Sequence, residues 1–146
     1  MFYGEFEHSI DKKGRVIIPS KFRDFFREYR VEKLYVTRGL DKCLFIFTEN
    51  EWKSQESRYR SLSLTRSDAR KFNRLFFGGA VEIECDKQGR ILLPKFLKDH
   101  AGIKRDVVVI GVSDRIEVWS RENYKEFYDQ SKDSYEEIAE KLFKEE

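Results

Sequence analysis

Apolar and polar residues alternate at the start of the chain, and a helical spacing follows. Residues 5–10 alternate with the period of two that is typical of a half-buried strand, and Val16–Ile18 continue as a short β-branched strand. Pro19 cannot donate to a sheet ladder but suits the first turn of a helix, so a helix is predicted to begin there. Its apolar positions recur at i, i+3, i+4 and i+7 and predict one aromatic face: Phe22, Phe25, Phe26 and Tyr29.

The same succession of elements recurs in the second half of the chain. Asp11–Pro19 returns as Asp86–Pro94 at an offset of 75 residues, and the two prolines are the only ones in the protein. Each unit reads strand, turn, strand, helix, strand, strand, with the last two strands at 34–37 and 43–47, and again at 107–110 and 116–119. This duplication predicts two copies that pack as a pseudo-dimer around a compact, mixed sheet.

Further helices are predicted after each unit. Thr48 and Ser120 occupy N-cap positions, because each precedes a new helical pattern. The first pattern continues into a helix over 67–77, whereas Tyr124–Leu142 form one long helical period. Aromatic residues make up 15% of the chain, more than this core requires. The surplus along 52–77 and 124–143 is interpreted as a subunit interface.

The two turns hold the candidate chemistry. Asp11-Lys12-Lys13-Gly14 and Asp86-Lys87-Gln88-Gly89 are typical of tight hairpin turns, in which Asp accepts local hydrogen bonds and Gly supplies a positive φ. With Arg15 the first turn carries a net charge of +2, and with Arg90 the second carries +1. Such cations reach phosphates, and arginine can donate two hydrogen bonds to guanine in the major groove. The same spacing also permits an Asp–Arg pair that only stabilises the turn, so both roles are open for the arginines.

Composition narrows the class of protein. At 146 residues, with 40% hydrophobic and 38% charged residues, the chain is expected to be a soluble globular protein. It has no apolar run long enough to span a membrane and no signal-peptide pattern, so a cytoplasmic location is expected. Cys43 and Cys85 lack a CxxC partner and are interpreted as reduced thiols that act as small apolar residues in strands.

Charge is distributed unevenly along the chain. The net charge is only +2, yet residues 133–146 hold six acids against Lys141 and Lys144, so the rest of the chain is basic. Arg66, Arg70 and Arg74 form a helical stripe. It is interpreted as a solvated face or as a set of ion pairs to a neighbouring subunit, and a second nucleic-acid surface is the alternative. The acidic end is interpreted as a solvated amphipathic helix, with a partner-binding helix as the alternative.

The sequence offers little for catalysis or metal binding. His8 and His100 are the only histidines and have no metal-ligand spacing with each other or with the cysteines. P-loop, GxGxxG and HExxH motifs are absent from the sequence. We therefore expect no catalytic residue, metal, cofactor or small-molecule substrate. An enzyme on a related barrel is the rival, which a pocket lined by convergent acids would favour.

The opening Gly4–Asp11 and the two DxxxR turns, each followed by a strand and a proline, resemble the MraZ family. This resemblance covers nearly the whole chain. It implies an α+β, mostly β fold of tandem swapped-hairpin AbrB-like repeats with peripheral helices. The implied units are a first repeat at 1–52, a helical connector at 53–79, a second repeat at 80–124 and a helical acidic tail at 125–146.

The resemblance also implies a function. MraZ proteins regulate, mainly as repressors, the bacterial cell-division and cell-wall gene cluster, and they bind short direct repeats in their own promoter as ring oligomers. Double-stranded DNA and further copies of the chain are thus the expected partners, at the nucleoid. The implied DNA contacts are Arg15, Lys13, Lys12, Arg90 and Lys87, with Asp11, Gly14, Asp86 and Gly89 shaping the turns. Gln88 replaces a cation, so the first turn should bind more strongly. An AbrB-like antitoxin or scaffold is the alternative.

Overall fold

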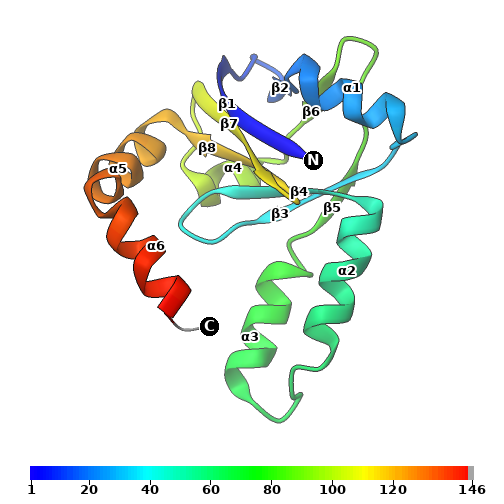
Figure 1. Ribbon diagram of the computed structural model, residues 1–146. Helices are drawn as coiled ribbons and strands as arrows, with labels where there is room; N and C mark the ends of the chain where they lie inside the picture. The colour runs from blue at the N-terminus through cyan, green and yellow to red at the C-terminus, as the bar shows by residue number, and fades with distance from the viewer. Residues whose placement is uncertain (145–146) are drawn as a thin grey trace.

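Both copies of the repeat form the predicted order of elements in the computed structural model, which describes residues 1–144 (Figure 1). The first copy consists of β1 (Phe2–Ser9), β2 (Arg15–Ile17), α1 (Ser20–Glu28), β3 (Leu34–Arg38) and β4 (Leu44–Thr48). The second consists of β5 (Val81–Ile83), β6 (Arg90–Leu92), α4 (Lys95–Ala101), β7 (Asp106–Ser113) and β8 (Ile116–Ser120). The remaining helices are α2 (Glu49–Arg60), α3 (Ser67–Phe76), α5 (Arg121–Ser131), the 3-10 turn η1 (Lys132–Ser134) and α6 (Tyr135–Lys144).

Strand order shows that the two copies are related by a pseudo-twofold axis. A six-stranded antiparallel sheet has the order β1-β7-β8-β4-β3-β5. When each strand is replaced by its equivalent in the other copy, the same order is obtained, read from the opposite edge of the sheet. A second, two-stranded sheet pairs β2 with β6, and there Val16 lies directly opposite its equivalent, Ile91. Both side chains are fully buried. The predicted pseudo-dimer is therefore confirmed.

The strands on either side of each turn do not form an ordinary hairpin. β1 pairs with β7 and β2 pairs with β6, so both strands around the first turn take their partners from the other copy. β5 likewise pairs with β3. A tight turn sets the direction of the chain locally, but the buried apolar faces decide which strands pair. The local hairpin pairing suggested by the sequence pattern is wrong, and the swapped arrangement is confirmed.

Two apolar clusters fill the opposite faces of the six-stranded sheet. The larger one lies between this sheet and the β2–β6 ribbon, and it includes Phe22 and Phe26 of α1 and Leu97 of α4. Tyr29, predicted on the same aromatic face, lies just beyond the end of α1 and is 62% exposed. The smaller cluster packs Trp52 and other aromatic residues of α2 and α3 against the outer face of the sheet.

The helices after each unit behave differently. Thr48 and Ser120 accept hydrogen bonds from the Glu51 and Asn123 backbone amides, as their N-cap positions predict. The single long helix predicted from Tyr124 is wrong, because η1 separates α5 from α6. Glu145 and Glu146 of the predicted acidic tail lie outside the described residues. None of the helices within residues 1–144 has the length and apolar character needed to cross a membrane.

Both cysteines are free thiols, as predicted, although neither lies within a strand. Cys43 directly precedes β4, and its complete burial raises the pKa of its thiol well above the ordinary value. Cys85 follows β5 and is half-buried, and burial raises its pKa as well. A thiol held in its protonated form is a poor nucleophile, so both cysteines serve as packing residues.

Candidate nucleic-acid interface

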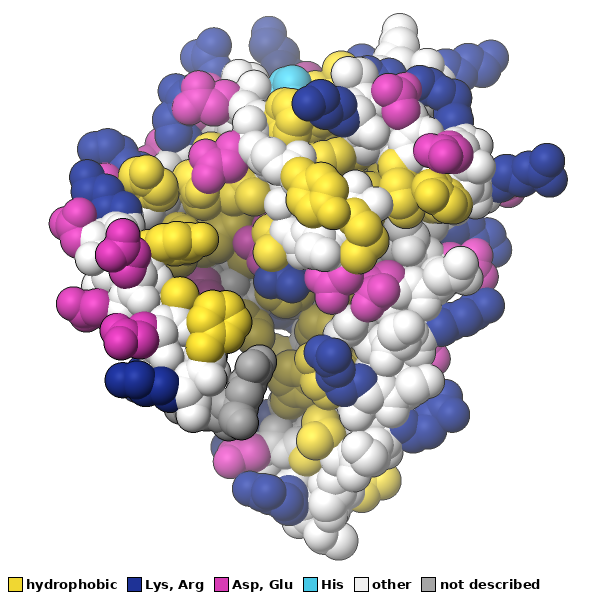
Figure 2. Space-filling model, viewed as in Figure 1, with side chains coloured by type: hydrophobic (Ala, Val, Ile, Leu, Met, Phe, Trp, Pro, Cys, Tyr) yellow, Lys and Arg dark blue, Asp and Glu magenta, His cyan; other side chains and the backbone are white. Residues whose placement is uncertain are grey.

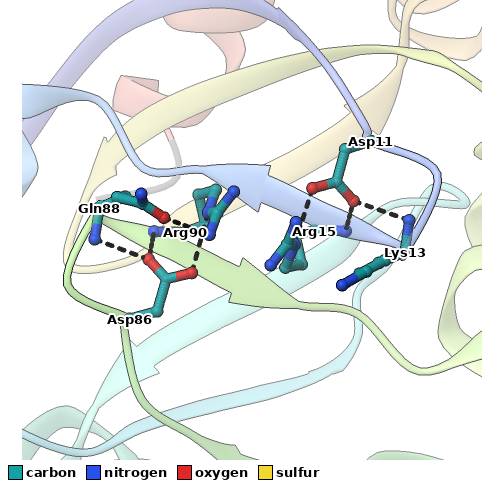
Figure 3. A network of polar contacts seen from close by, with 6 residues as sticks. All are labelled: Asp11, Lys13, Arg15, Asp86, Gln88 and Arg90. Atoms are coloured by element: carbon teal, nitrogen blue, oxygen red, sulfur yellow. Dashed lines mark hydrogen bonds and ion pairs between the residues drawn. The ribbon is translucent and has the colours of Figure 1, made fainter.

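Each turn is organised by one carboxylate (Figure 3). Asp11 Oδ1 accepts hydrogen bonds from the Lys13 and Arg15 backbone amides, both at 2.9 Å, and Oδ2 accepts one from Arg15 Nε at 2.7 Å. Asp86 repeats this pattern with the Gln88 and Arg90 amides and with Arg90 Nε, each at 2.9 Å. The aspartates therefore close the turns and orient the arginines. The Asp–Arg pair allowed by the spacing exists in both copies.

The glycines connect each turn to the opposite copy. Gly14 and Gly89 have φ values of +84° and +79°, a region that residues with a Cβ rarely adopt. The Gly14 carbonyl accepts a hydrogen bond from Leu93 N at 2.9 Å, and the Gly89 carbonyl accepts one from Ile18 N at 2.8 Å. The two turns are thus held at the two ends of one ribbon. In Figure 1 they lie at the end of the molecule opposite α3 and the C-terminus.

Charge within the turns is arranged so that the arginines keep donors available. Hydrogen bonds from the arginine backbone amides, helped by the guanidinium groups, lower the pKa of Asp11 and Asp86. Both carboxylates are therefore ionised at neutral pH. Arg15 uses only Nε in its bond to Asp11, and within residues 1–144 its Nη atoms have no hydrogen-bond partner. Arg90 also donates through Nη2 to Gln88 Oε1, so fewer of its donors are free.

The lysines surround the turns without ion-pair partners. Lys12, Lys13 and Lys87 are exposed, and none of them forms an ion pair with any residue from 1 to 144. Such lysines can move toward a polyanion without first breaking an internal contact. The structure places the residues predicted for DNA contact or turn shape in two clusters, one at each end of the β2–β6 ribbon, and their role in binding stays a prediction.

Four further residues lie in this region that the turn motif did not include. Arg23 and Lys98 project from α1 and α4 onto the turn glycines of the opposite copy, where Arg23 Nε also donates to Ile18 O at 2.9 Å. The two residues are 75 apart, so the repeat offset could have revealed them. On the ribbon, Leu92 lies opposite Arg15 and Ile17 opposite Arg90. Strand alternation could have placed these apolar side chains beside the arginines.

A cleft of about 530 Å³ adjoins the second turn. Its four cations are Arg23, Arg27, Arg30 and Lys87, and its three acids are Glu32, Glu84 and Asp86. Asp86 is already bound to Arg90 and Arg27 to Asp24, which leaves Arg23, Arg30 and Lys87 against Glu32 and Glu84. Within residues 1–144, no cluster of histidine, cysteine and acidic side chains has the geometry of a metal site. The charged side chains of the cleft therefore sum to only +1.

Comparison with known proteins agrees with this duplicated architecture. A family model described as "MraZ protein, putative antitoxin-like" matches residues 1–75 and, separately, residues 76–146. The chain belongs to the MraZ family. It is thus two MraZ units in tandem, each with one turn and one strand of the ribbon, and MraZ is a family of regulators rather than enzymes.

One solved structure also shares sequence with the chain. The solution structure of PHS018 from Pyrococcus horikoshii is 21% identical to it, and the match covers 81% of this chain and 88% of that chain with a TM-score of 0.32.

Proposed function

We propose that this MraZ-family chain is a sequence-specific DNA-binding transcriptional regulator that uses both turns. The observation that supports it most directly is the pair of oriented arginines at the two ends of one ribbon, Arg15 beside two unpaired lysines and Arg90 beside one. Its proposed target is the promoter of its own operon, the bacterial cell-division and cell-wall gene cluster. There it acts mainly as a repressor at the nucleoid, by binding short direct repeats.

The geometry suits reading of the major groove. A two-stranded ribbon fits this groove, and an arginine fixed at Nε keeps its Nη donors for the two acceptors of guanine. Arg15 has this arrangement more fully than Arg90, whose Nη2 is engaged by Gln88. Lys12, Lys13 and Lys87 bind phosphates, as do Arg23 and Lys98 beside the turns, so affinity should fall as salt rises.

Self-association allows a chain of low net charge to bind DNA tightly. The net charge of one chain is only +2, but several copies that present their turns to repeated sites gain affinity from avidity. Such linkage adds about 10²–10⁴ in affinity without any new contact. We therefore propose a ring oligomer that binds direct repeats.

The test is anisotropy of a labelled promoter duplex that contains the repeats. Replacing Arg15 by Ala should weaken binding by about 1–3 kcal/mol, and Arg90→Ala should weaken it less. Arg121→Ala is the matched control, because Arg121 lies on α5 and pairs with Glu7 and Asp106 instead. Unchanged binding by a folded variant that lacks both turn arginines would exclude the proposed site.

The second candidate function is an antitoxin or scaffold that acts through protein contacts. It is favoured by the exposed apolar residues of α6 and by the wording of the family description. Deleting residues 133–146 distinguishes the two functions. Loss of a protein partner, with unchanged binding to a duplex that holds a single repeat, would show that both activities reside in the chain.

A further inference from the structure

The helices α3 and α6 carry the same apolar spacing but differ in what covers it. Ala69, Phe72 and Phe76 on α3 follow i, i+3, i+7, and so do Tyr135, Ile138 and Leu142 on α6. The α3 residues pack internally, with Phe72 and Phe76 against Tyr59 of α2 at ring-centroid distances of 4.8 and 5.5 Å. The stripe on α6, in contrast, has exposed fractions of 75%, 48% and 58%.

The sequence of α5 explains why α6 does not fold back in the same way. At the offset of 72 that relates α2 to α5, Ser131 replaces Tyr59, so α5 offers no equivalent aromatic ring. None of the described residues of α6 is buried. Figure 2 shows hydrophobic side chains along α6 facing a hollow between this helix and α2–α3. The apolar stripe of α6 therefore has no counterpart in its own unit.

A complementary surface lies elsewhere on the same chain. An open cleft of about 330 Å³ at the end of the α2–α3 hairpin is lined by Tyr59, Leu62, Leu64, Asn73 and Phe77, among others. Leu64 is 78% exposed, and the buried Oδ1 of Asn73 has no donor among residues 1–144. The cleft thus presents mainly apolar side chains, with Glu56 and Arg60 as the charged residues of its lining.

Charge matches the two surfaces to each other. Six cations lie on or beside the end of the α2–α3 hairpin, and none forms an ion pair with another residue of 1–144: Arg58, Arg60, Arg66, Arg70, Lys71 and Arg74. Glu56 and Asp68 are the acids of the same segment, so residues 56–77 keep a net charge of +4. The described residues of α6 hold three acids against Lys141 and Lys144, a net charge of −1, and Glu136 and Glu137 are unpaired within residues 1–144. Opposite charges around an apolar centre are the arrangement of a specific protein interface.

We propose that α6 of one copy docks through its apolar stripe into the α2–α3 cleft of a second copy. The proposal rests on the self-association in the proposed function and names the surfaces that produce it. Because donor and acceptor are different surfaces, the contact is head-to-tail, and its repetition closes a ring or extends a filament.

The first experiment measures mass by light scattering or sedimentation. Ile138→Ser with Leu142→Ser should reduce the oligomer to the single-chain mass of 17.6 kDa, and Leu62→Ser with Leu64→Ser should do the same. These side chains are exposed in one copy, so circular dichroism should show intact folding. Lys125→Ser with Asp129→Ser is the matched control, because this exposed ion pair lies on α5, outside both surfaces, and its removal keeps the net charge constant.

Mixing the two apolar variants tests the direction of docking. One retains an intact cleft and the other an intact α6, so an equimolar mixture should form a dimer of twice 17.6 kDa and nothing larger. Failure of the mixture to combine would refute head-to-tail docking. An intact oligomer in both separate variants would show that these surfaces do not form the contact, although the protein still self-associates. A monomeric unmodified protein would refute self-association itself.

Discussion

Gly89→Ala should destabilise the protein more than Gly14→Ala, although the two glycines occupy equivalent positions. A Cβ at Gly89 would lie 2.5 Å from Arg23 Cδ, whereas at Gly14 the nearest atom is the flexible end of Lys98, at 2.9 Å. Arg23 therefore has to move, and it then gives up the 2.9 Å hydrogen bond from its Nε to Ile18 O.

The magnitudes follow from these contacts. Holding an alanine in the left-handed region costs about 1–2 kcal/mol at either position. Losing the Arg23 hydrogen bond adds about 0.5–1.5 kcal/mol at Gly89 alone. We therefore expect a loss of about 1.5–3.5 kcal/mol for Gly89→Ala and about 1–2 kcal/mol for Gly14→Ala. In an Arg23→Ala background the cost of Gly89→Ala should fall to that of Gly14→Ala.

Urea unfolding followed by tryptophan fluorescence measures these differences, with unchanged m-values as the condition for comparing midpoints. Gly89→Asn separates the backbone cost from the loss of the Arg23 hydrogen bond, because asparagine tolerates the left-handed region but still carries the Cβ. Equal losses for the two alanine variants, together with no coupling between positions 89 and 23, would refute the role assigned to Arg23.

Three further predictions concern charge and packing. Because the pKa of Asp11 and of Asp86 is lowered in the folded chain, their contribution to stability is complete only above about pH 5 and is lost as the pH falls through the lowered values. In acid titration, the stability difference between the unmodified chain and Asp11→Asn should therefore close only in that range. Gln88→Lys should strengthen DNA binding and steepen the salt dependence by about one unit, measured as log K against log salt, because it adds a cation and releases Arg90. Ile91→Ala should cost about 2–5 kcal/mol in urea unfolding, and Leu92→Ala less than about 0.5 kcal/mol, because Ile91 is fully buried and Leu92 is 57% exposed.

Much of the candidate site could be predicted because its chemistry is local. Asp11 and Arg15 are four residues apart, so the turn alone brings the carboxylate to the guanidinium. Arg23 and Lys98 could not be placed by the same reasoning, since each reaches the turn of the other copy through the fold. The unequal freedom of Arg15 and Arg90 likewise depends on where the Gln88 side chain points.

The sequence by itself determined the duplication, the order of elements in each copy, the two closed turns and the capped starts of α2 and α5. These features depend on residues close in the chain, whose spacing and hydrogen-bonding groups act before any distant contact forms. Only the tertiary structure decided that β2 pairs with β6, that α3 packs on Tyr59 and that the apolar stripe of α6 remains exposed. Pairing and packing depend on which apolar surfaces meet across long loops, and that choice is a property of the whole chain.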